Sequence, residues 1–125
     1  MVDPRSVTIL GIDHVQVAAP RGCEAEARAF YGGLLGLEEL EKPVPLRARG
    51  GGWFRAGTHE LHVGVEEPFG PARKAHPGFV VDDLAALAER LRAQGIEVTP
   101  DETIPGVERA YVADPFGNRL ELRRA

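Results

Sequence analysis

An internal duplication limits the fold of this chain more than any other feature of its sequence. The first half predicts an apolar strand, an amphipathic helix and three short strands, at residues 8–18, 23–35, 37–42, 52–55 and 60–66. The second half predicts the same series, with a helix that ends before Gly95 and strands at residues 79–81, 96–99, 109–113 and 119–123. A repeated βαβββ unit indicates an α+β fold built from two tandem modules.

Capping residues mark the ends of both predicted helices. Asp82 or Asp83 can cap the second helix at its start, and Gly36 and Gly95 lie just beyond the ends of the two helices. The second helix also presents four apolar side chains on one face, Leu84, Leu87, Ala88 and Leu91. It is therefore the best-supported element of the sequence.

The length of the chain and one linker define its organisation. A chain of 125 residues can form one domain with a hydrophobic core but is too short for two independent domains. The segment 68–74 contains two prolines and a glycine and is typical of a linker. We expect a single domain, 1–125, made of a first module, a linker and a second module at about 7–67, 68–75 and 76–124.

Each half carries one histidine and one glutamate at matching positions. His14 and Glu60 are 46 positions apart, and His76 and Glu121 are 45 positions apart. Two imidazoles and two carboxylates suit a divalent ion such as Zn²⁺, Ni²⁺, Co²⁺, Mn²⁺ or Fe²⁺, and they leave coordination positions for water or substrate. A lone histidine in a strand is usually packed rather than metal-bound. The paired positions nevertheless favour one metal site formed by all four residues.

His62 is an alternative to Glu60 as the metal ligand of the first module. Residues two apart on a strand share a face, so His62 and Glu60 point the same way, whereas His59 points the other way. The dipeptide Glu-Leu at 60–61 matches the dipeptide Glu-Leu at 121–122. This match favours Glu60, and His62 is kept as the alternative.

Several cationic and aromatic residues are candidates for substrate binding. Arg109 and Tyr111 share a face of the penultimate strand, and Trp53 and Arg55 lie on a strand of the first module. A guanidinium pairs well with a carboxylate or phosphate, and an indole can cover an apolar part of a ligand. We predict that these four residues and His62 contact a small-molecule substrate.

Composition and charge exclude other classes of partner. The chain has 15 Lys and Arg against 19 Asp and Glu, a net charge of −4, and so lacks the basic field that nucleic-acid binding requires. No apolar run approaches the roughly 20 residues needed to cross a bilayer, and the N-terminus has no export signal. We expect a cytoplasmic protein. Cys23, the only cysteine, cannot form an intramolecular disulfide and is expected to be a structural bystander.

Five segments together resemble the vicinal oxygen chelate superfamily, which groups glyoxalases, bleomycin resistance proteins and extradiol dioxygenases. These segments lie at residues 12–15, 30–37, 59–61, 76–82 and 114–122. The resemblance implies that the two modules form a curved, incomplete barrel with helices on the outer face and a divalent metal inside. In metal-dependent glyoxalases of this group the ligands map onto His14, Glu60, His76 and Glu121. It also implies a homodimer, because a partner chain covers the free edges of the sheets.

Three functions are compatible with the resemblance. The complete set of ligands favours a glyoxalase-type lyase, isomerase or epimerase, in which the metal stabilises an enediolate and Glu60 or Glu121 acts as the base. A ring-cleaving dioxygenase is less favoured, because such members bind iron with two histidines and one glutamate and have longer chains. The third function is that of a bleomycin-resistance-type protein that sequesters a small molecule, and such proteins commonly lack the ligand set.

Overall fold

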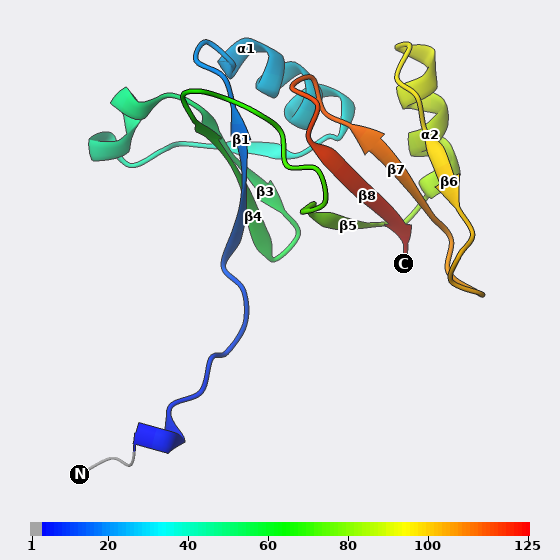
Figure 1. Cartoon of the computed structure of the whole chain (residues 1–125), viewed down its shortest axis with the longest axis horizontal. Coiled ribbons are helices and arrows are strands. Elements are labelled where there is room, and N and C mark those ends of the chain that lie inside the picture. Colours follow the sequence, from blue (N-terminus) through cyan, green and yellow to red (C-terminus); the bar gives the residue numbers. More distant parts are fainter. Residues whose placement is uncertain (1–3) are drawn as a thin grey trace.

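The computed structural model describes residues 4–125, which form two βαβββ modules side by side (Figure 1). The first module consists of β1 (His14–Ala19), α1 (Glu24–Ala27), η2 (Arg28–Leu34), β2 (Glu38–Leu40), β3 (Gly52–Ala56) and β4 (His59–Val65). The second module consists of β5 (Gly78–Val81), α2 (Leu84–Ala93), β6 (Thr99–Asp101), β7 (Arg109–Ala113) and β8 (Arg119–Arg124). Of two short 3-10 helices, η1 (Pro4–Ser6) precedes the first module and η3 (Val44–Arg49) lies between β2 and β3.

Each module forms a four-stranded sheet with the same internal arrangement. The strand orders are β1-β4-β3-β2 and β5-β8-β7-β6. In each sheet the first and last strands of the module pair in parallel, and the other pairs are antiparallel. The predicted α+β fold of two tandem βαβββ modules is confirmed, and the two sheets do not join into a closed barrel.

The hydrophobic core covers one face of each sheet. Leu61 and Val63 of β4 are buried on this face, as are Leu120 and Leu122 of β8. Successive side chains of a strand point to opposite faces, so the residues that alternate with Leu61, Val63, Leu120 and Leu122 lie on the other side of each sheet. We call that other side the polar face. It carries the candidate site residues of both modules.

The first predicted helix, at residues 23–35, is present but changes type along its length. After α1 the chain continues as η2, a π-helix whose end is marked by a bond from the backbone N–H of Leu35 to the carbonyl of Phe30, at 2.9 Å. Such five-residue turns are rare and occur mostly as short segments within α-helices. The helix buries Phe30 and Tyr31 against the sheet and ends before Gly36, whose φ is +73°.

The second predicted helix is α2, and the structure shows which of the two aspartates caps it. The carboxylate of Asp83 accepts a hydrogen bond from the backbone N–H of Ala86 at 3.0 Å, so Asp83 rather than Asp82 is the N-cap. Three of the four predicted apolar side chains are buried, Leu87, Ala88 and Leu91. Across residues 4–125 no helix has the length and apolar character that crossing a membrane requires.

The first strand starts later than predicted. It begins at His14 rather than at residue 8. Its partner β4 begins just after the turn at Gly57, so the residues before His14 have no strand residues of β4 to pair with. The preceding segment extends away from the modules (Figure 1). This segment, which we call the N-terminal arm, comprises residues 7–13 and exposes four large apolar side chains, Val7, Ile9, Leu10 and Ile12.

The strand predicted at residues 96–99 also starts later, at Thr99. The residues before it belong to the end of α2 instead. The backbone N–H of Ile96 donates to the carbonyl of Leu91 at 3.1 Å, and Val98 is buried in the core. The backbone N–H of Ile96 is therefore bonded at the end of α2 and is not available for pairing in a strand.

A buried polar cluster ties the two modules together. The hydroxyl of Tyr31 in η2 donates to Asp114 Oδ2 at 2.7 Å, across the boundary between the modules. Asn118 Nδ2 donates to the carbonyl of Ala18 in β1 at 2.7 Å and to Asp114 Oδ2 at 2.9 Å. Burial raises the pKa of Tyr31, so its hydroxyl stays a donor. The predicted hairpin turn from Asp114 to Asn118 is present and also joins the modules.

Candidate metal centre

The polar face of the first module brings together three of the predicted site residues. The parallel pairing of β1 with β4 places His14 directly beside Glu60. His62 Nε2 lies 2.9 Å from Glu60 Oε1, and the rings of His14 and His62 stack with their centroids 4.2 Å apart. Trp53 stacks on the other face of His62 at 4.0 Å and leaves this imidazole 4% exposed. We call His14, Glu60 and His62 the first half-site.

The second module places its two predicted ligands in contact. His76 precedes β5, and Glu121 lies on β8, which pairs with β5. His76 Nε2 lies 3.2 Å from Glu121 Oε1. The same oxygen lies 3.3 Å from Arg109 Nη1 and 3.5 Å from the Tyr111 hydroxyl. We call His76 and Glu121 the second half-site.

His14 and His76 share an orientation typical of metal ligands. His14 Nδ1 lies 2.9 Å from Asp13 Oδ2, and His76 Nδ1 lies 2.8 Å from the carbonyl of Lys74. Both oxygens can only accept a hydrogen bond, so each Nδ1 carries a proton when the imidazole is neutral. The Nε2 lone pair then stays free, as in most metal-binding histidines.

The contact between His76 and Glu121 fits a cation better than a neutral pair. When its Nδ1 is the donor, a neutral His76 offers a lone pair at Nε2 and faces the carboxylate of Glu121 with no proton between them. The contact is favourable if the imidazole is protonated or if a cation lies between the two atoms. Ligands bound at about 2.0–2.2 Å lie roughly 3 Å from one another in a metal shell. The separation of 3.2 Å agrees with this value.

One chain by itself does not unite the half-sites. Within residues 4–125 no group of three or more His, Cys, Asp or Glu side chains is arranged to hold a metal ion. The four predicted ligands therefore occur as two separate pairs, one on each sheet. The ligand set fits a divalent metal in its chemistry, but it needs the two half-sites to meet.

The predicted substrate-binding residues flank these pairs. Arg109 and Tyr111 contact Glu121, and Trp53 covers His62. Arg55 lies opposite Glu60 in the β3–β4 ladder but forms its ion pair with the carboxylate of Glu38 on the edge strand β2, at 3.6 Å.

Sequence reasoning missed two arginines on β8. Arg119 and Arg123 share the polar face with Glu121, because all three occupy alternate positions of one strand. The Cζ atom of Arg119 lies 3.9 Å from the centroid of the Tyr111 ring, and Arg123 Nε lies 3.8 Å from Glu121 Oε2. The same two-residue period that identified Glu60 and His62 as neighbours would have identified these arginines.

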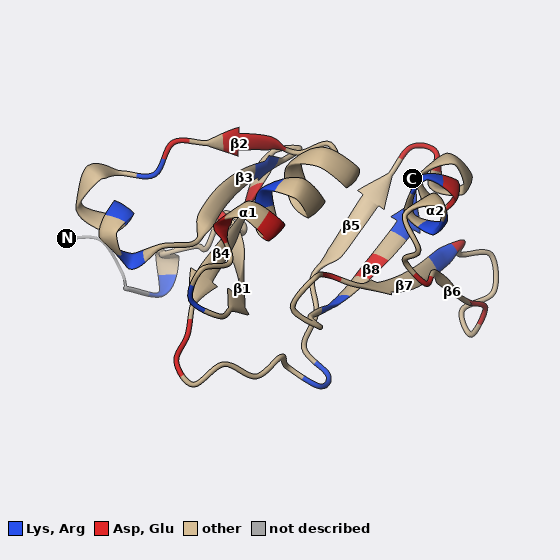
Figure 2. Ribbon diagram, turned by 90° about the horizontal axis from the view of Figure 1, so that it is seen from above, with Lys and Arg blue, Asp and Glu red and all other residues tan. Residues whose placement is uncertain are grey.

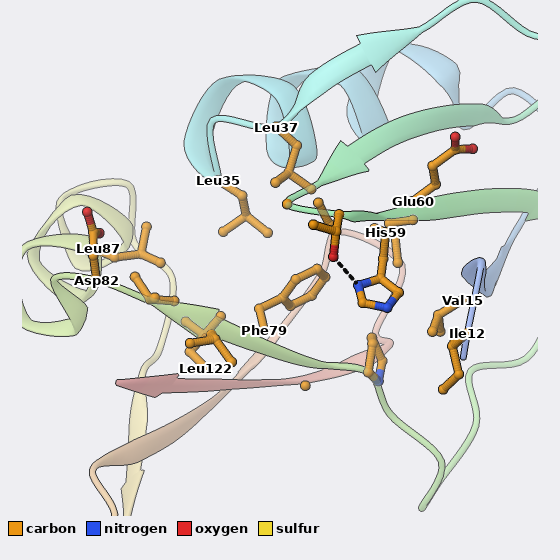
Figure 3. Close-up of a pocket in the computed structure, with 18 residues that line it drawn as sticks. Ile12, Val15, Leu35, Leu37, His59, Glu60, Phe79, Asp82, Leu87 and Leu122 are labelled. Atoms are coloured by element: carbon orange, nitrogen blue, oxygen red, sulfur yellow. Dashed lines mark hydrogen bonds between the residues drawn. The ribbon is translucent and has the colours of Figure 1, made fainter. Parts of the chain in front are cut away.

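The cavities of the structure differ in character. A cavity of about 750 Å³ lies between the modules and is lined mainly by apolar side chains that surround Phe79 (Figure 3). Glu60 stands at its rim with the carboxylate directed away from Phe79 (Figure 3). A smaller cavity of about 400 Å³ has polar residues of both modules in its wall, including Gln16, His76 and Arg119. Of these two cavities, the smaller one contacts the second half-site, through His76.

Cys23 is expected to be unreactive in the folded protein. Its side chain is 1% exposed, and burial together with the neighbouring carboxylate of Glu24 raises the pKa of the thiol to about 11. At pH 8 almost all of the thiol is therefore protonated, and the thiolate is the reactive species. We expect Ellman's reagent to label no thiol in native protein at pH 8 and one thiol per chain in guanidinium chloride. Rapid labelling of the native protein would contradict this interpretation.

Comparison with known proteins agrees with the architecture. A profile of the Glyoxalase/Bleomycin resistance protein/Dioxygenase superfamily matches residues 11–122. The crystal structure of a glyoxalase family protein from Bacillus anthracis is 55% identical in sequence, with a TM-score of 0.91, and the alignment covers 94% of this chain and 97% of that chain. A search of curated proteins found no significant match.

Two more distant structures share the fold. Lactoylglutathione lyase from Agrobacterium tumefaciens is 23% identical, with a TM-score of 0.72 and coverage of 94% of this chain and 95% of that chain. A fosfomycin resistance protein from Listeria monocytogenes is 16% identical, with a TM-score of 0.75 and the same coverage of both chains. Since the profile spans nearly the whole chain and the fold has its two βαβββ modules, this protein belongs to the Glyoxalase/Bleomycin resistance protein/Dioxygenase superfamily.

Proposed function

We propose that two copies of this chain form a homodimer in which the first half-site of one copy and the second half-site of the other hold one divalent metal ion. The observation that carries this proposal is the division of the ligands. His76 and Glu121 are poised as a pair, yet one chain offers no third ligand to them within residues 4–125. A second copy supplies the missing His14 and Glu60 without any change in the fold.

The exposed apolar surface supports a dimer. The N-terminal arm carries four exposed large apolar side chains, and Val15 on the edge strand β1 is also exposed. An arm of this kind gains free energy when a partner covers it. Both β1 and β5 are edge strands, and edge strands usually need cover. We propose that the second copy covers this surface.

The residues around the paired glutamates favour proton transfer. We propose a glyoxalase-type lyase, isomerase or epimerase that moves a proton on a small oxygenated substrate. A divalent ion would supply Lewis-acid stabilisation of the negative charge that develops on the substrate oxygens. One of Glu60 and Glu121 accepts the proton from the carbon next to a carbonyl, and the same or the other glutamate returns a proton to the substrate. Arg109 and Tyr111 orient the Glu121 carboxylate. The site is drawn from both modules, so each contributes one base.

A second candidate function is sequestration of a small molecule, as the name of the superfamily's bleomycin resistance members suggests. The cavity of about 750 Å³ around Phe79 is large enough for a small ligand and is mainly apolar. Under this alternative, the protein binds an apolar compound and needs no metal. Metal binding therefore discriminates between the two functions.

We expect protein stripped with EDTA to take up about one divalent ion per chain, with micromolar or tighter affinity for at least one of Zn²⁺, Ni²⁺, Co²⁺, Mn²⁺ and Fe²⁺. Calorimetry and elemental analysis of protein without a histidine tag measure this uptake. Glu121→Gln and Glu60→Gln should each weaken the binding at least roughly 10-fold, since each removes a charged ligand without changing its shape. Absence of uptake would leave sequestration as the better interpretation.

Two further variants make this measurement specific. Glu108→Gln removes an exposed carboxylate of the second module, which pairs with Arg124, and should leave metal affinity unchanged. His62→Ala should weaken the affinity only a few-fold, because in this proposal His62 positions Glu60 through the contact at 2.9 Å. Loss of binding in His62→Ala with binding intact in Glu60→Gln would make His62 the ligand. Glu60 would then not be a metal ligand, and the proposed transfer of a substrate proton by a pair of metal-bound glutamates would fail.

A further inference from the structure

Arg119 is a cation without an acidic partner on the polar face of the second module. Its guanidinium stacks on Tyr111 at 3.9 Å, and no carboxylate among residues 4–125 pairs with it. The other arginines of β7 and β8 each have a carboxylate within 4 Å. Stacking holds the plane of a guanidinium and leaves the N–H groups at its edge free for a ligand.

Arg119 and the second half-site border one cavity. The cavity of about 400 Å³ is lined by Arg119 together with His76, which belongs to the second half-site. Gln16, Asn118 and one carboxylate residue, the exposed Glu66, also contribute to its wall. A small molecule in this cavity would reach Arg119 with one end and the half-site with the other.

The charge of this face favours an anion. Three guanidinium groups, those of Arg109, Arg119 and Arg123, share it with two carboxylates, those of Asp101 and Glu121. Figure 2 shows basic segments of β7 and β8 around the acidic segment in the middle of β8. The excess of one positive charge resides on Arg119, because the other two arginines are paired.

We propose that Arg119 binds an oxyanion of the substrate, a carboxylate or a phosphoryl group, at the end of the cavity remote from the reacting carbon. Arginine presents two parallel N–H donors that match two oxygens of either group. This inference rests on the proposed function for the identity of the reacting end. The anion contact itself requires no metal. The substrate is accordingly a small anion that carries its charge a few bonds from the carbonyl.

The test is an NMR titration of metal-free protein at low ionic strength with inorganic phosphate and, separately, with pyruvate. We expect at least one of these anions to bind with a dissociation constant in the millimolar range and to shift backbone amide signals of β8. Arg119→Gln should weaken that binding at least roughly 10-fold. Arg124 lies on the same strand but on the opposite face and pairs with Glu108. The variant Arg124→Gln should therefore bind the anion as tightly as the wild type does. Binding of phosphate alone indicates a phosphoryl substrate, and binding of pyruvate indicates a carboxylate.

Two results overturn the inference. The first is that neither anion binds the wild-type protein, and the second is that Arg119→Gln binds as tightly as the wild type. Metal uptake by Arg119→Gln, measured in parallel, should equal that of the wild type, because Arg119 is not a proposed ligand. Anion binding without metal uptake in the wild type would refute the proposed function and keep the anion site. Metal uptake with no anion binding would refute the anion site and keep the proposed function.

Discussion

Mixing two variants that each fail to bind metal is expected to restore metal binding. One variant carries His14→Ala and Glu60→Gln, which remove the first half-site, and the other carries His76→Ala and Glu121→Gln, which remove the second. In a heterodimer with a shared site, one pair of intact half-sites meets and the other site loses both halves. An equal mixture after subunit exchange should therefore bind about one quarter of the wild-type amount of metal. Elemental analysis of the mixture measures this recovery.

A matched control identifies the source of the recovery. Mixing His14→Ala with Glu60→Gln places both substitutions in the same half-site, so every heterodimer site stays incomplete and the mixture binds no more metal than the separate variants. Light scattering shows whether each variant is still dimeric. A site formed within one chain predicts no recovery in either mixture, and that result in dimeric protein would refute the shared site. A monomeric wild-type protein would refute it as well.

Local sequence patterns predicted most of the fold. The helix ends at Gly36 and Gly95 and the turn from Asp114 to Asn118 follow from residues close in sequence, and the structure contains all three. The predicted starts of two strands were wrong. β6 starts late because the residues before it end α2, and β1 starts late because a strand begins where its partner offers backbone groups. For β1 that limit is the turn at Gly57, more than 40 positions away. A single-strand pattern carries no information about such a limit.

The candidate site was predictable to the extent that it follows the repeat. The matching positions of the histidines and glutamates predicted both pairs, and the alternation of strand residues predicted that His62 shares a face with Glu60. The stack of His14, His62 and Trp53 was not predictable, because it depends on three strands in register and on side-chain orientation. The role of Arg119 likewise depends on its position above Tyr111 on the neighbouring strand.

Asp114→Ala is expected to destabilise the protein more than any other single change in the turn between β7 and β8. The carboxylate is 5% exposed and accepts hydrogen bonds from the hydroxyl of Tyr31, from the backbone N–H groups of Phe116 and Asn118, and from Asn118 Nδ2. Alanine removes the acceptor of the Tyr31 hydroxyl and of the two backbone N–H groups, and Asn118 Nδ2 keeps only its bond to the carbonyl of Ala18. We expect the free energy of unfolding to fall by about 3 kcal/mol, as measured by urea denaturation.

Two companion variants show whether this loss arises from the junction of the modules. Asp83→Ala removes only the cap of α2 and should cost about 1 kcal/mol. Tyr31→Phe removes one donor and leaves the contacts within the turn intact, so its cost should lie between the other two. Equal costs for Asp114→Ala and Asp83→Ala would show that the cluster contributes only as a turn. If Asp114→Ala costs more than Asp83→Ala and Tyr31→Phe is also costly, the turn stabilises the junction of the modules. The turn then also fixes the position of β8, which carries Glu121, relative to β1, which carries His14, because Asn118 donates to the carbonyl of Ala18.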